Sequence, residues 1–472
     1  MGVTSNSKEV KNNFVFGALK GKKFDGNNFI KRFLNFQNVV VVTANIEKGI
    51  KILSGNQKTR FTIIHTKNSK CLVYEIANLF YSNGIPEKIA VTGTNGKTSV
   101  SDYVRQIWEK KGVLCSSIGT LGVFFKKKKI LDNNLTTLEA IQFNKVMSKL
   151  YKDGCKKLVI EASSIGIDQS RIYPSTFDKV GFTNLTNDHL DYHKSFLNYK
   201  KSKGKLFHDY TKKNSYAVLN SDDKNFYFFK NLCEKKKIKT LDYGLKAEFL
   251  KINKISSIEN YKIVRFTLKN KKKELKLKDS NTFEIYNKFC AIILVYGQKL
   301  RLSNFDEIRF LQNPKGRLEK IHSLDFSIFV DYAHTPDALE NVLRDLKLSK
   351  HKNLFALIGC GGNRDIKKRP RMTKIALKYC DHVILADDNP RFENPSKIRK
   401  EMLRGVSQVK TKKISNIGDR KKAIEFGLKK LSKNDFFIIC GKGHEEYQII
   451  GNKKKKFSDT EVVKRYLKNG II

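Results

Sequence analysis

A short apolar segment that ends in a glycine-rich loop and continues as a helix constrains the fold of this chain most strongly. The apolar segment is Lys88–Thr92, the loop is Gly93-Thr94-Asn95-Gly96-Lys97-Thr98, and the apolar residues that follow are Val100, Tyr103, Val104, Ile107 and Trp108. Spacing of i, i+3, i+4, i+7 and i+8 places those five side chains on one face of a helix. A buried strand, a tight turn and an amphipathic helix predict a parallel sheet covered by helices.

The glycine loop has the chemistry of a site for nucleotide phosphates. Glycines let backbone N–H groups approach phosphate oxygens, and the N-terminus of the next helix adds a favourable dipole. Lys97 can reach the β- and γ-phosphates of ATP or GTP, and Thr98 can bind Mg²⁺. Because the loop has two residues fewer between its glycines than the usual pattern, a glycine turn without a ligand stays open as the alternative.

The length and charge of the chain narrow its class. A chain of 472 residues has room for about three domains. Its formal net charge is +47, but 40% hydrophobic and 11% aromatic residues can still form cores, which excludes global disorder. The basic residues run from end to end, with short runs at Lys126–Lys129, Lys271–Lys273 and Lys453–Lys456 that fit turns or hairpin tips. This spread argues against a nucleic-acid-binding face and favours attraction of anionic small molecules such as nucleotides.

Membrane and secretory features are missing from the sequence. The longest apolar stretches fall far short of the roughly 20 residues that cross a bilayer, and Met1–Lys11 has no apolar core like that of a secretory signal. The eight cysteines show no paired spacing typical of a zinc site or a disulfide framework. We therefore expect a reduced, cytoplasmic protein with no membrane segment and no nucleic-acid partner.

The apolar runs predict an α/β protein of three domains, at residues 1–86, 87–312 and 313–472. The first is a small α/β module with strands near Phe14–Phe16, Val39–Val42 and Phe61–Ile64. The second holds the phosphate loop, with strands at Lys88–Thr92, Leu158–Glu161, Val180–Thr183 and Ala217–Leu219, a hairpin or edge sheet between about Lys239 and Leu277, and a closing helix at Asn281–Tyr296. A linker near Asn313–Gly316 leads to a third, Rossmann-like domain with strands at Ile328–Val330, Leu354–Ile358, Val383–Leu385 and Phe436–Ile439.

Six further segments carry a family resemblance. They are Glu161–Gly166 (EASSIG), Phe182–His193 (FTNLTNDHLDYH), Asp331–Pro336 (DYAHTP), Gly359–Asp365 (GCGGNRD), Asp388–Arg391 (DNPR) and Gly441–Glu445 (GKGHE). In this order and spacing they resemble the Mur ligases over essentially the whole chain, and the short glycine loop is the normal form in that family. The resemblance implies an ATP-dependent ligase of peptidoglycan synthesis, which extends a UDP-linked muramyl peptide through an acyl-phosphate intermediate and works as a monomer.

Glu161 and His189 are natural metal ligands opposite the phosphate loop, because acyl transfer from ATP needs positive charge to neutralise its intermediates. By resemblance they hold Mg²⁺ together with Thr98 and with Lys203 as a carbamate (N6-carboxylysine). The chemistry of Lys203 is plausible because Lys200, Lys201 and Lys205 would lower its pKa towards the neutral amine that captures CO₂. The alternatives are that Glu161 caps a helix, that His189 is a satisfied buried histidine, and that Lys203 is a solvated lysine.

The resemblance also assigns residues to the two nucleotide substrates. Asn287, Arg317, Asp331 and His334 resemble residues that close over ATP, and their alternative is an interdomain hydrogen-bond network. UDP-N-acetylmuramoyl-L-alanyl-D-glutamate would bind Ser7 in a first domain that also carries Gly21–Gly26, and Thr136, Thr137, Ser163, Gln169 and Arg171 in the second. The chain departs from the family at Leu138, where we expect loop variation, and at Ile165, which replaces a histidine near the metals.

The string Asp388–Arg391 bears on the amino acid that is added. Members that add meso-diaminopimelate carry Asp-Asn-Pro-Arg, whereas lysine-adding members lack the arginine. The physics agrees, because a guanidinium can hold the extra carboxylate of diaminopimelate and repels the ammonium of lysine. The matching positions are Arg364, Asp388, Asn389, Arg391, Gly441 and Glu445, with Glu445 accepting from the distal ammonium. A surface salt bridge is the alternative for Arg391, and a lysine-adding ligase, a folylpolyglutamate-type ligase or a nucleic-acid-binding NTPase are the alternative functions.

Overall fold

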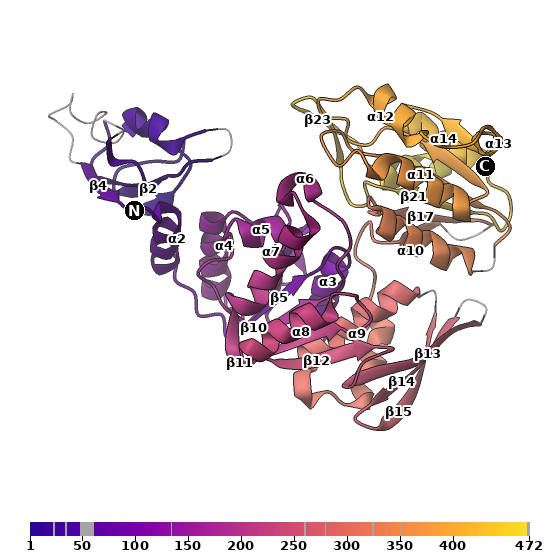
Figure 1. The fold of residues 1–472 in the computed structure, drawn as a ribbon, viewed down its shortest axis with the longest axis horizontal. Helices are drawn as coiled ribbons and strands as arrows, with labels where there is room; N and C mark the ends of the chain where they lie inside the picture. Colours follow the sequence, from indigo (N-terminus) through magenta and orange to yellow (C-terminus); the bar gives the residue numbers. More distant parts are fainter. Residues whose placement is uncertain are drawn as a thin grey trace.

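The computed structural model describes residues 1–21, 24–33, 35–47, 61–133, 135–258, 261–278, 280–322, 325–349 and 351–469. The chain forms three lobes that follow one another along the sequence, each built on its own large sheet (Figure 1). The α/β class with three sheets is as expected. The proposed domain boundaries at 86/87 and 312/313 fall between α2 and β5 and between η3 and β16, whose bounds are given below.

The N-terminal lobe is a parallel sheet of four strands in sequential order. Its elements are β1 Gly2–Thr4, β2 Phe14–Ala18, the 3-10 helix η1 Gly26–Phe33, β3 Val39–Thr43, β4 Phe61–His65 and α2 Ser69–Phe80. The three expected strands are among them. Helix α2 packs on one face, and its Val73 and Ala77 share a buried cluster with Ala140 and Ile141 of the next lobe. Lys22 and Lys23 of the Gly21–Gly26 segment lie outside the described residues.

The central lobe holds a sheet of eleven strands. Its elements are β5 Glu87–Thr92, α3 Lys97–Lys110, β6 Cys115–Gly119, β7 Gly122–Phe125, β8 Lys128–Leu131, α4 Ala140–Lys152, β9 Lys157–Glu161, α5 Ser164–Asp168, β10 Phe177–Phe182, α6 Leu190–His193, α7 Phe196–His208, β11 Thr211–Asn220, α8 Phe226–Lys235, β12 Lys239–Gly244, β13 Leu250–Ile258, β14 Tyr261–Leu268, β15 Lys271–Lys278, α9 Thr282–Tyr296, η2 Gly297–Lys299 and η3 Leu302–Phe310. Strand β5 lies between β10 and β9, and all three run parallel. The carboxyl ends of β9 and β10 therefore flank the phosphate loop.

Only the middle of this sheet is parallel, so the expectation of a parallel central sheet is corrected to a mixed one. Strands β13, β14 and β15 form an antiparallel meander at one edge, as expected for the segment 239–277, although β12 itself pairs in parallel with β11. Strands β7 and β8 form a hairpin at the other edge, and Lys126 and Lys127 make its turn with left-handed φ angles of 51° and 63°. The run Lys453–Lys456 is an exposed strand, β23, and not a turn, because it pairs with β22.

The C-terminal lobe is a six-stranded sheet in the order β16-β17-β21-β18-β19-β20, parallel except for β16. Its elements are β16 Glu319–His322, β17 Ser327–Asp331, α10 Pro336–Lys347, β18 Leu354–Ile358, α11 Lys368–Tyr379, β19 His382–Leu385, α12 Pro395–Met402, α13 Gln408–Thr411, β20 Ile414–Asn416, α14 Arg420–Lys429, β21 Phe436–Cys440, β22 Tyr447–Ile450, β23 Lys453–Lys456 and α15 Asp459–Lys468. Two buried clusters cover its two faces. The parallel strands bring the loops that begin near Asp331, Gly359 and Gly441 to one edge.

The central and C-terminal lobes contact each other beside the phosphate loop. Arg317, on the segment that joins them, donates a hydrogen bond to Thr98 at 3.0 Å, and the backbone N–H of Thr282 donates to Asp345 at 2.8 Å. In Figure 1 the C-terminal lobe stands above both the α3 region and the β13–β15 meander. None of the helices in the described part of the chain is long and apolar enough to cross a membrane.

Candidate active site

Both glycines of the phosphate loop are required, because neighbouring atoms leave no room for a Cβ atom and because the backbone has positive φ angles. Gly93 has a φ of 154°, and a Cβ atom there would lie 1.9 Å from Thr183 Oγ1. Gly96, the N-cap of α3, has a φ of 86°, and its Cβ would lie 2.4 Å from Asn287 Oδ1. L-residues rarely adopt these φ values, so any side chain would disturb the loop. The sequence expectation of a strand, glycine loop and helix is confirmed.

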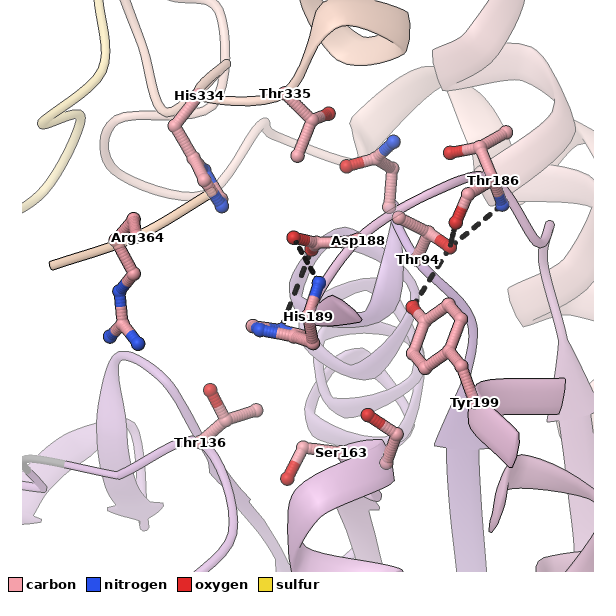
Figure 2. Close-up of polar contacts among 12 residues, drawn as sticks. Thr94, Thr136, Ser163, Thr186, Asp188, His189, Tyr199, His334, Thr335 and Arg364 are labelled. Atoms are coloured by element: carbon pink, nitrogen blue, oxygen red, sulfur yellow. Dashed lines mark hydrogen bonds and ion pairs between the residues drawn. The ribbon is translucent and has the colours of Figure 1, made fainter. Parts of the chain in front are cut away.

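The segment after β10 holds this loop in place. Asn184 accepts from the backbone N–H groups of Thr94 and Asn95, through its own carbonyl oxygen at 2.8 Å and its side-chain oxygen at 2.9 Å. The Thr94 hydroxyl accepts from the N–H of Thr186 at 2.9 Å and lies 3.0 Å from the hydroxyl of Tyr199 (Figure 2). The loop is therefore fixed before any ligand binds.

Two lysines, the half-buried Lys97 and the buried Lys203, share one backbone oxygen of the loop. Lys97 Nζ donates to the carbonyl oxygens of Gly93 and Thr94 at 2.8 and 2.9 Å, and Lys203 Nζ, from α7, donates to Gly93 at 2.7 Å. The Lys203 side chain also lies against the ring of Tyr199. Burial lowers the pKa of both ammonium groups, and the charge of Lys97 lowers the pKa of Lys203 further.

This environment corrects the sequence reasoning about Lys203. The residue is 1% exposed, so the alternative of a solvated lysine on a basic helix is wrong. The groups that lower its pKa are the surrounding protein and Lys97, whereas Lys201 and Lys205 on the same helix point to solvent. Residues one or two positions apart lie on different faces of a helix. Lys201 and Lys205 are therefore not the cause of the lowered pKa of Lys203.

Glu161 lies at the end of β9 and is 2% exposed. Its carboxylate accepts from the Thr98 hydroxyl at 2.8 Å, and from the N–H and hydroxyl of Thr120 at 2.8 and 3.1 Å. The alternative that Glu161 caps a helix is wrong, because Ser163 caps α5 by accepting from the N–H of Gly166. Thr120 carries no sequence signal, since it belongs to a turn between β6 and β7 and to no motif.

His189 is the left-handed N-cap of α6, and its side chain is 36% exposed, so it is not the satisfied buried histidine of the alternative. Its Nε2 lies 3.4 Å from Asp188 Oδ2, and the ring points into the open space below His334 (Figure 2). Desolvation lowers the pKa of His189, although Asp188 opposes this effect. The neutral imidazole can therefore offer a lone pair to a cation.

The donors suit Mg²⁺ only in part. Thr98 and Glu161 offer hard oxygen atoms 2.8 Å apart, but no three His, Cys, Asp or Glu side chains converge as a ligand set within the described ranges. The Glu161 carboxylate raises the pKa of Lys97, and the charge of Lys97 lowers the pKa of His189. Conversion of Lys203 to an anionic carbamate would supply the missing oxygen ligand beside that ammonium.

Asp188 is a site residue to which the sequence analysis gave no role. Burial alone would raise the pKa of its carboxyl, but the charges of His189, His334 and Lys368 hold the pKa at about 2. His334 and Lys368 belong to the C-terminal lobe. Asp188 is therefore an anion on the central lobe that faces the Lys368 ammonium and the His334 imidazole of the other lobe.

Three of the four residues expected to close over ATP line one cleft of about 470 Å³ between these lobes, namely Asn287, Arg317 and Asp331. Asn95, Gly96 and Thr98 of the phosphate loop line the same cleft. The Arg317 guanidinium lies 4.3 Å from the centre of the Tyr332 ring. Both Asp331 oxygens are taken by backbone N–H groups, of Leu318 at 2.6 Å and Ala333 at 2.7 Å. Burial raises the pKa of Asp331, and its bonds fix the segment that carries Arg317.

His334 lies apart from this cleft and lines the neighbouring pocket. Its Nδ1–H donates to the Tyr332 carbonyl at 2.9 Å, and its own carbonyl accepts from Lys368 Nζ at 2.8 Å. Burial, followed by the charge of Lys368, lowers its pKa to about 4. These bonds lie within the C-terminal lobe. Among the contacts described for the four residues, only the bond from Arg317 to Thr98 joins the two lobes, so the interdomain network that we held as the alternative is present at Arg317 alone.

The residues expected at the muramyl dipeptide bind mainly to one another. Thr137 is 2% exposed and its hydroxyl lies 2.9 Å from both the Glu161 carbonyl and the Ser163 hydroxyl. Arg171 donates to Gln169 Oε1 at 2.7 and 3.0 Å and to the Thr137 carbonyl at 2.9 Å.

Thr136 accepts from the Thr120 hydroxyl at 3.2 Å, and the half-buried Ser7 lies after β1 on the N-terminal lobe. The structure brings Thr136, Thr137, Ser163, Gln169 and Arg171 together beside Glu161, and it leaves Ser7 in another lobe. Leu138 lies in the loop before α4 and is 1% exposed in the core of the central lobe, and loop variation at this position stays a prediction.

All six residues expected at the amino-acid head line one pocket of about 140 Å³: Arg364, Asp388, Asn389, Arg391, Gly441 and Glu445. Its other wall is formed by Asp188, His189 and Asp191 of the central lobe. Arg391 has a left-handed φ of 53° and donates to the Gly362 carbonyl at 2.9 Å. Burial, and then the nearby charge of Arg364, lower the pKa of Arg391, so the pocket presents two crowded guanidinium groups.

Glu445 and Asn389 are held by a lysine that the sequence analysis did not single out. Lys442, completely buried, donates to Glu445 Oε2 at 3.0 Å and to Asn389 Oδ1 at 3.1 Å. Asn389 Nδ2 also donates to Glu445 Oε2 at 2.9 Å. The pocket therefore joins a fixed carboxylate to two guanidinium groups. The alternative of a surface salt bridge for Arg391 is wrong, because it contacts carbonyl oxygens inside this pocket.

A phosphate loop that faces a Rossmann-like lobe across two polar pockets defines an ATP-dependent ligase. Residues 91–295 match the Mur ligase middle domain, and residues 316–443 match the Mur ligase, glutamate ligase domain. The chain belongs to the Mur ligase family.

Relatives match over nearly the whole chain. The protein of Rickettsia conorii named UDP-N-acetylmuramoyl-L-alanyl-D-glutamate--2,6-diaminopimelate ligase is 38% identical, with 99% of this chain and 96% of its own length covered. The relative of the same name from Aquifex aeolicus is also 38% identical, with coverages of 99% and 93%.

Solved structures agree with this assignment. A structure under the same ligase name has a TM-score of 0.69 and 28% identity, and covers 99% of this chain and 95% of its own. The MurF ligase from Thermotoga maritima in complex with ADP has a TM-score of 0.65 at 18% identity, with coverages of 99% and 97%, and shows likeness of fold alone.

Proposed function

We propose that this chain joins the γ-carboxylate of D-glutamate in UDP-N-acetylmuramoyl-L-alanyl-D-glutamate to an amine of meso-diaminopimelate, at the expense of ATP, as a cytoplasmic monomer of peptidoglycan synthesis. The observation that carries the proposal is the pocket in which Arg364, Arg391 and Glu445 meet the wall formed by Asp188 and His189. The names of the relatives that match 99% of the chain support it.

The reaction divides into two steps that suit the two pockets. The γ-carboxylate attacks the γ-phosphorus of ATP, which forms an acyl phosphate and releases ADP. The amine then attacks the acyl carbon, loses a proton and expels inorganic phosphate. Both intermediates concentrate negative charge on phosphoryl or carbonyl oxygens, and fixed cations stabilise such charge. Lys97 donates to the phosphate loop and Arg317 donates to Thr98, so these two cations are placed to stabilise that negative charge.

Mg²⁺ would be held by Thr98, Glu161, His189 and the carbamate of Lys203, and it would supply charge neutralisation for the phosphates. The low pKa of Lys203 favours the neutral amine that captures CO₂. Lys97 donates to carbonyl oxygens of its own loop, so its side chain would have to turn to reach the phosphates of ATP.

The amino-acid head would bind through charge. The two guanidinium groups of Arg364 and Arg391 suit a carboxylate, whereas Glu445 suits the ammonium beside it. Lysine carries an ammonium where diaminopimelate has this complete amino-acid head, so the two arginines would repel it. This contrast disfavours a lysine-adding ligase.

The test is to incubate the protein with ATP, Mg²⁺, the UDP-linked dipeptide and meso-diaminopimelate, and to follow both phosphate release and the mass of the UDP product. We expect one phosphate for each product that has gained one diaminopimelate residue. Omitting the dipeptide should abolish phosphate release. Phosphate release that responds to nucleic acid, or to a folate in place of the dipeptide, would overturn the proposal in favour of the other functions considered.

A further inference from the structure

A second large cleft lies between the central and C-terminal lobes, on the side of the meander β13–β15. Its volume is about 770 Å³, and it shares no lining residue with the nucleotide cleft. Strands β14 and β15 and the helices α9 and η3 form one wall, and β16, β17 and α10 form the other. None of the proposed substrates has a role here.

The cleft is lined by six basic side chains and two acidic ones. The basic residues are Lys262, Lys276, Lys278, Lys288, Arg309 and Lys320, and the acidic ones are Glu284 and Glu319. Five of the basic residues belong to the central lobe, and Lys320 comes from β16 of the C-terminal lobe. A concave site lined by one sign of charge concentrates ions of the opposite sign.

Two of these lysines are buried, and the ammonium group of each donates to one hydroxyl. Lys288, on α9, is 6% exposed, and its Nζ donates to the Ser280 hydroxyl at 3.4 Å. Lys262, on β14, is 7% exposed, and its Nζ donates to the Ser257 hydroxyl at 2.8 Å. Among the described residues, neither ammonium has a carboxylate within 4 Å. A buried ammonium that donates to a single hydroxyl retains two N–H groups for a ligand.

The acidic residues of the cleft are already engaged. Glu284 accepts from the N–H and side chain of Asn281 and from Asn313 Nδ2, and it closes the capping box of α9. Glu319 accepts from the N–H of Gly316 at 2.8 Å. These carboxylates make hydrogen bonds to neighbouring groups and form no ion pair with the two lysines. The charge of Glu284 still raises the pKa of Lys288 against the effect of burial, and the charge of Lys262 acts on Asp345.

We propose that this cleft is a second anion site, which binds a small phosphate compound of at least two negative charges, such as pyrophosphate, through the Lys262 and Lys288 ammonium groups. Lys276, Lys278 and Lys320 line the rim and add attraction at longer range. Charge-assisted hydrogen bonds from ammonium to phosphate oxygens are among the stronger ones in proteins. Because Lys320 lies on the C-terminal lobe, that lobe would also attract a bound anion, near the segment 311–318.

Isothermal titration with inorganic pyrophosphate tests the site. The wild-type chain is compared with the double variant Lys262→Met/Lys288→Met, and Met keeps the length and the apolar stem of the side chain. We expect the variant to bind pyrophosphate about a hundredfold more weakly, because it loses two charge-assisted contacts worth about a factor of ten each. The matched control Lys246→Met/Lys464→Met removes the same charge from exposed positions and should bind as the wild type does.

Two results would overturn the site. Equal loss in the double variant and in the control would mean attraction by net charge alone. Loss in Lys97→Ala with retention in the double variant would place the pyrophosphate in the phosphate loop.

If the double variant does not fold, as judged by its thermal transition, the exposed pair Lys278→Ala/Lys320→Ala replaces it, and we expect about fivefold weaker binding from the loss of long-range attraction. Unchanged binding in that pair would also contradict the proposal.

Discussion

The phosphate loop and the amino-acid pocket differ in how their charged groups are satisfied. In the loop, Lys97 and Lys203 donate to backbone oxygens, and Glu161 accepts from Thr98 and Thr120, so the polar atoms already have partners. In the pocket, Arg364 and Arg391 lie close enough for each to oppose the charge of the other.

This difference indicates how each site meets its ligand. The loop must exchange internal hydrogen bonds for bonds to phosphate and metal. The pocket instead holds two neighbouring guanidinium groups, and a substrate carboxylate would add to the Asp191 carboxylate that lies 3.8 Å from Arg364. We therefore expect substitutions in the loop to damage the chemical step, and substitutions in the pocket to damage recognition of the amino acid.

The largest effect should come from Lys97→Ala. Removing the ammonium that we propose binds the β- and γ-phosphates should lower kcat by about 10³-fold or more, as for other fixed groups that stabilise developing charge. Phosphate release measures the rate, and far-UV circular dichroism should show an unchanged fold. The exposed Lys201→Ala is the control and should retain wild-type activity. A normal rate in Lys97→Ala would remove the loop from the reaction.

Lys203→Ala should be nearly as severe, with a loss of about 10²- to 10³-fold, since the carbamate ligand disappears. Added formate or acetate should restore part of the activity, because a small carboxylate can occupy the vacated position. Mass spectrometry under CO₂ should in addition detect the carbamate on the wild-type protein only. Near-normal activity of Lys203→Ala without added acid would reject the carbamate, although the residue is buried.

Arg391→Ala should affect the amino acid and not the nucleotide. The loss of charge-assisted bonds of about 1.5 to 3 kcal/mol predicts a drop of roughly a hundredfold in kcat/KM for meso-diaminopimelate. The KM for ATP should stay unchanged. Arg371→Ala, an exposed arginine on α11, serves as the control. An equal rise of both KM values would mean that Arg391 supports the lobe and does not read the substrate.

The smallest expected effect is on the folding stability at acid pH. It tests the pocket directly, because His334 faces the Asp188 carboxylate across it. The pKa of His334 is about 4 in the folded chain and 6.5 by its ordinary value. The unfolded state therefore binds the proton more readily, and stability should fall as the pH drops from about 6.5 to about 4. One proton contributes at most about 1.4 kcal/mol per pH unit. Urea unfolding of His334→Gln should show a shallower slope in this window, and an identical slope would contradict the shifted pKa.

Contiguous features could be predicted from the sequence, while contacts between distant segments could not. The run from Gly93 to Thr98 holds its strand, turn and helix in one stretch, so its local structure follows from spacing. The pocket residues were found one by one through motifs at the carboxyl ends of β18, β19 and β21. The hydrogen bonds of Arg171 to Gln169 and Thr137, and the burial of Lys203, depend on how the helices pack. A lysine-rich helix does not reveal which of its faces meets the sheet.

Some site contacts carry no signal of their own in the sequence. Thr120 donates to Glu161 from a turn, Lys442 donates to Glu445 within one motif, and Asp337 accepts from Asn95 and Thr186 across the lobes at 3.4 Å. The contacts of Thr120 and Asp337 join segments that only the packing of the chain brings together. The antiparallel edges of the central sheet were partly predictable, because alternation marks strands but does not tell their direction.

The most direct measurement is the ratio of kcat/KM for meso-diaminopimelate to that for L-lysine, with ATP and the UDP-linked dipeptide held saturating. The two guanidinium groups of the pocket predict a ratio of about a hundred or more in favour of meso-diaminopimelate, by the loss of charge-assisted bonds and the repulsion of the lysine ammonium. A ratio below one, with L-lysine preferred, would contradict the assignment of Arg364 and Arg391 to the distal carboxylate and with it the proposed acceptor.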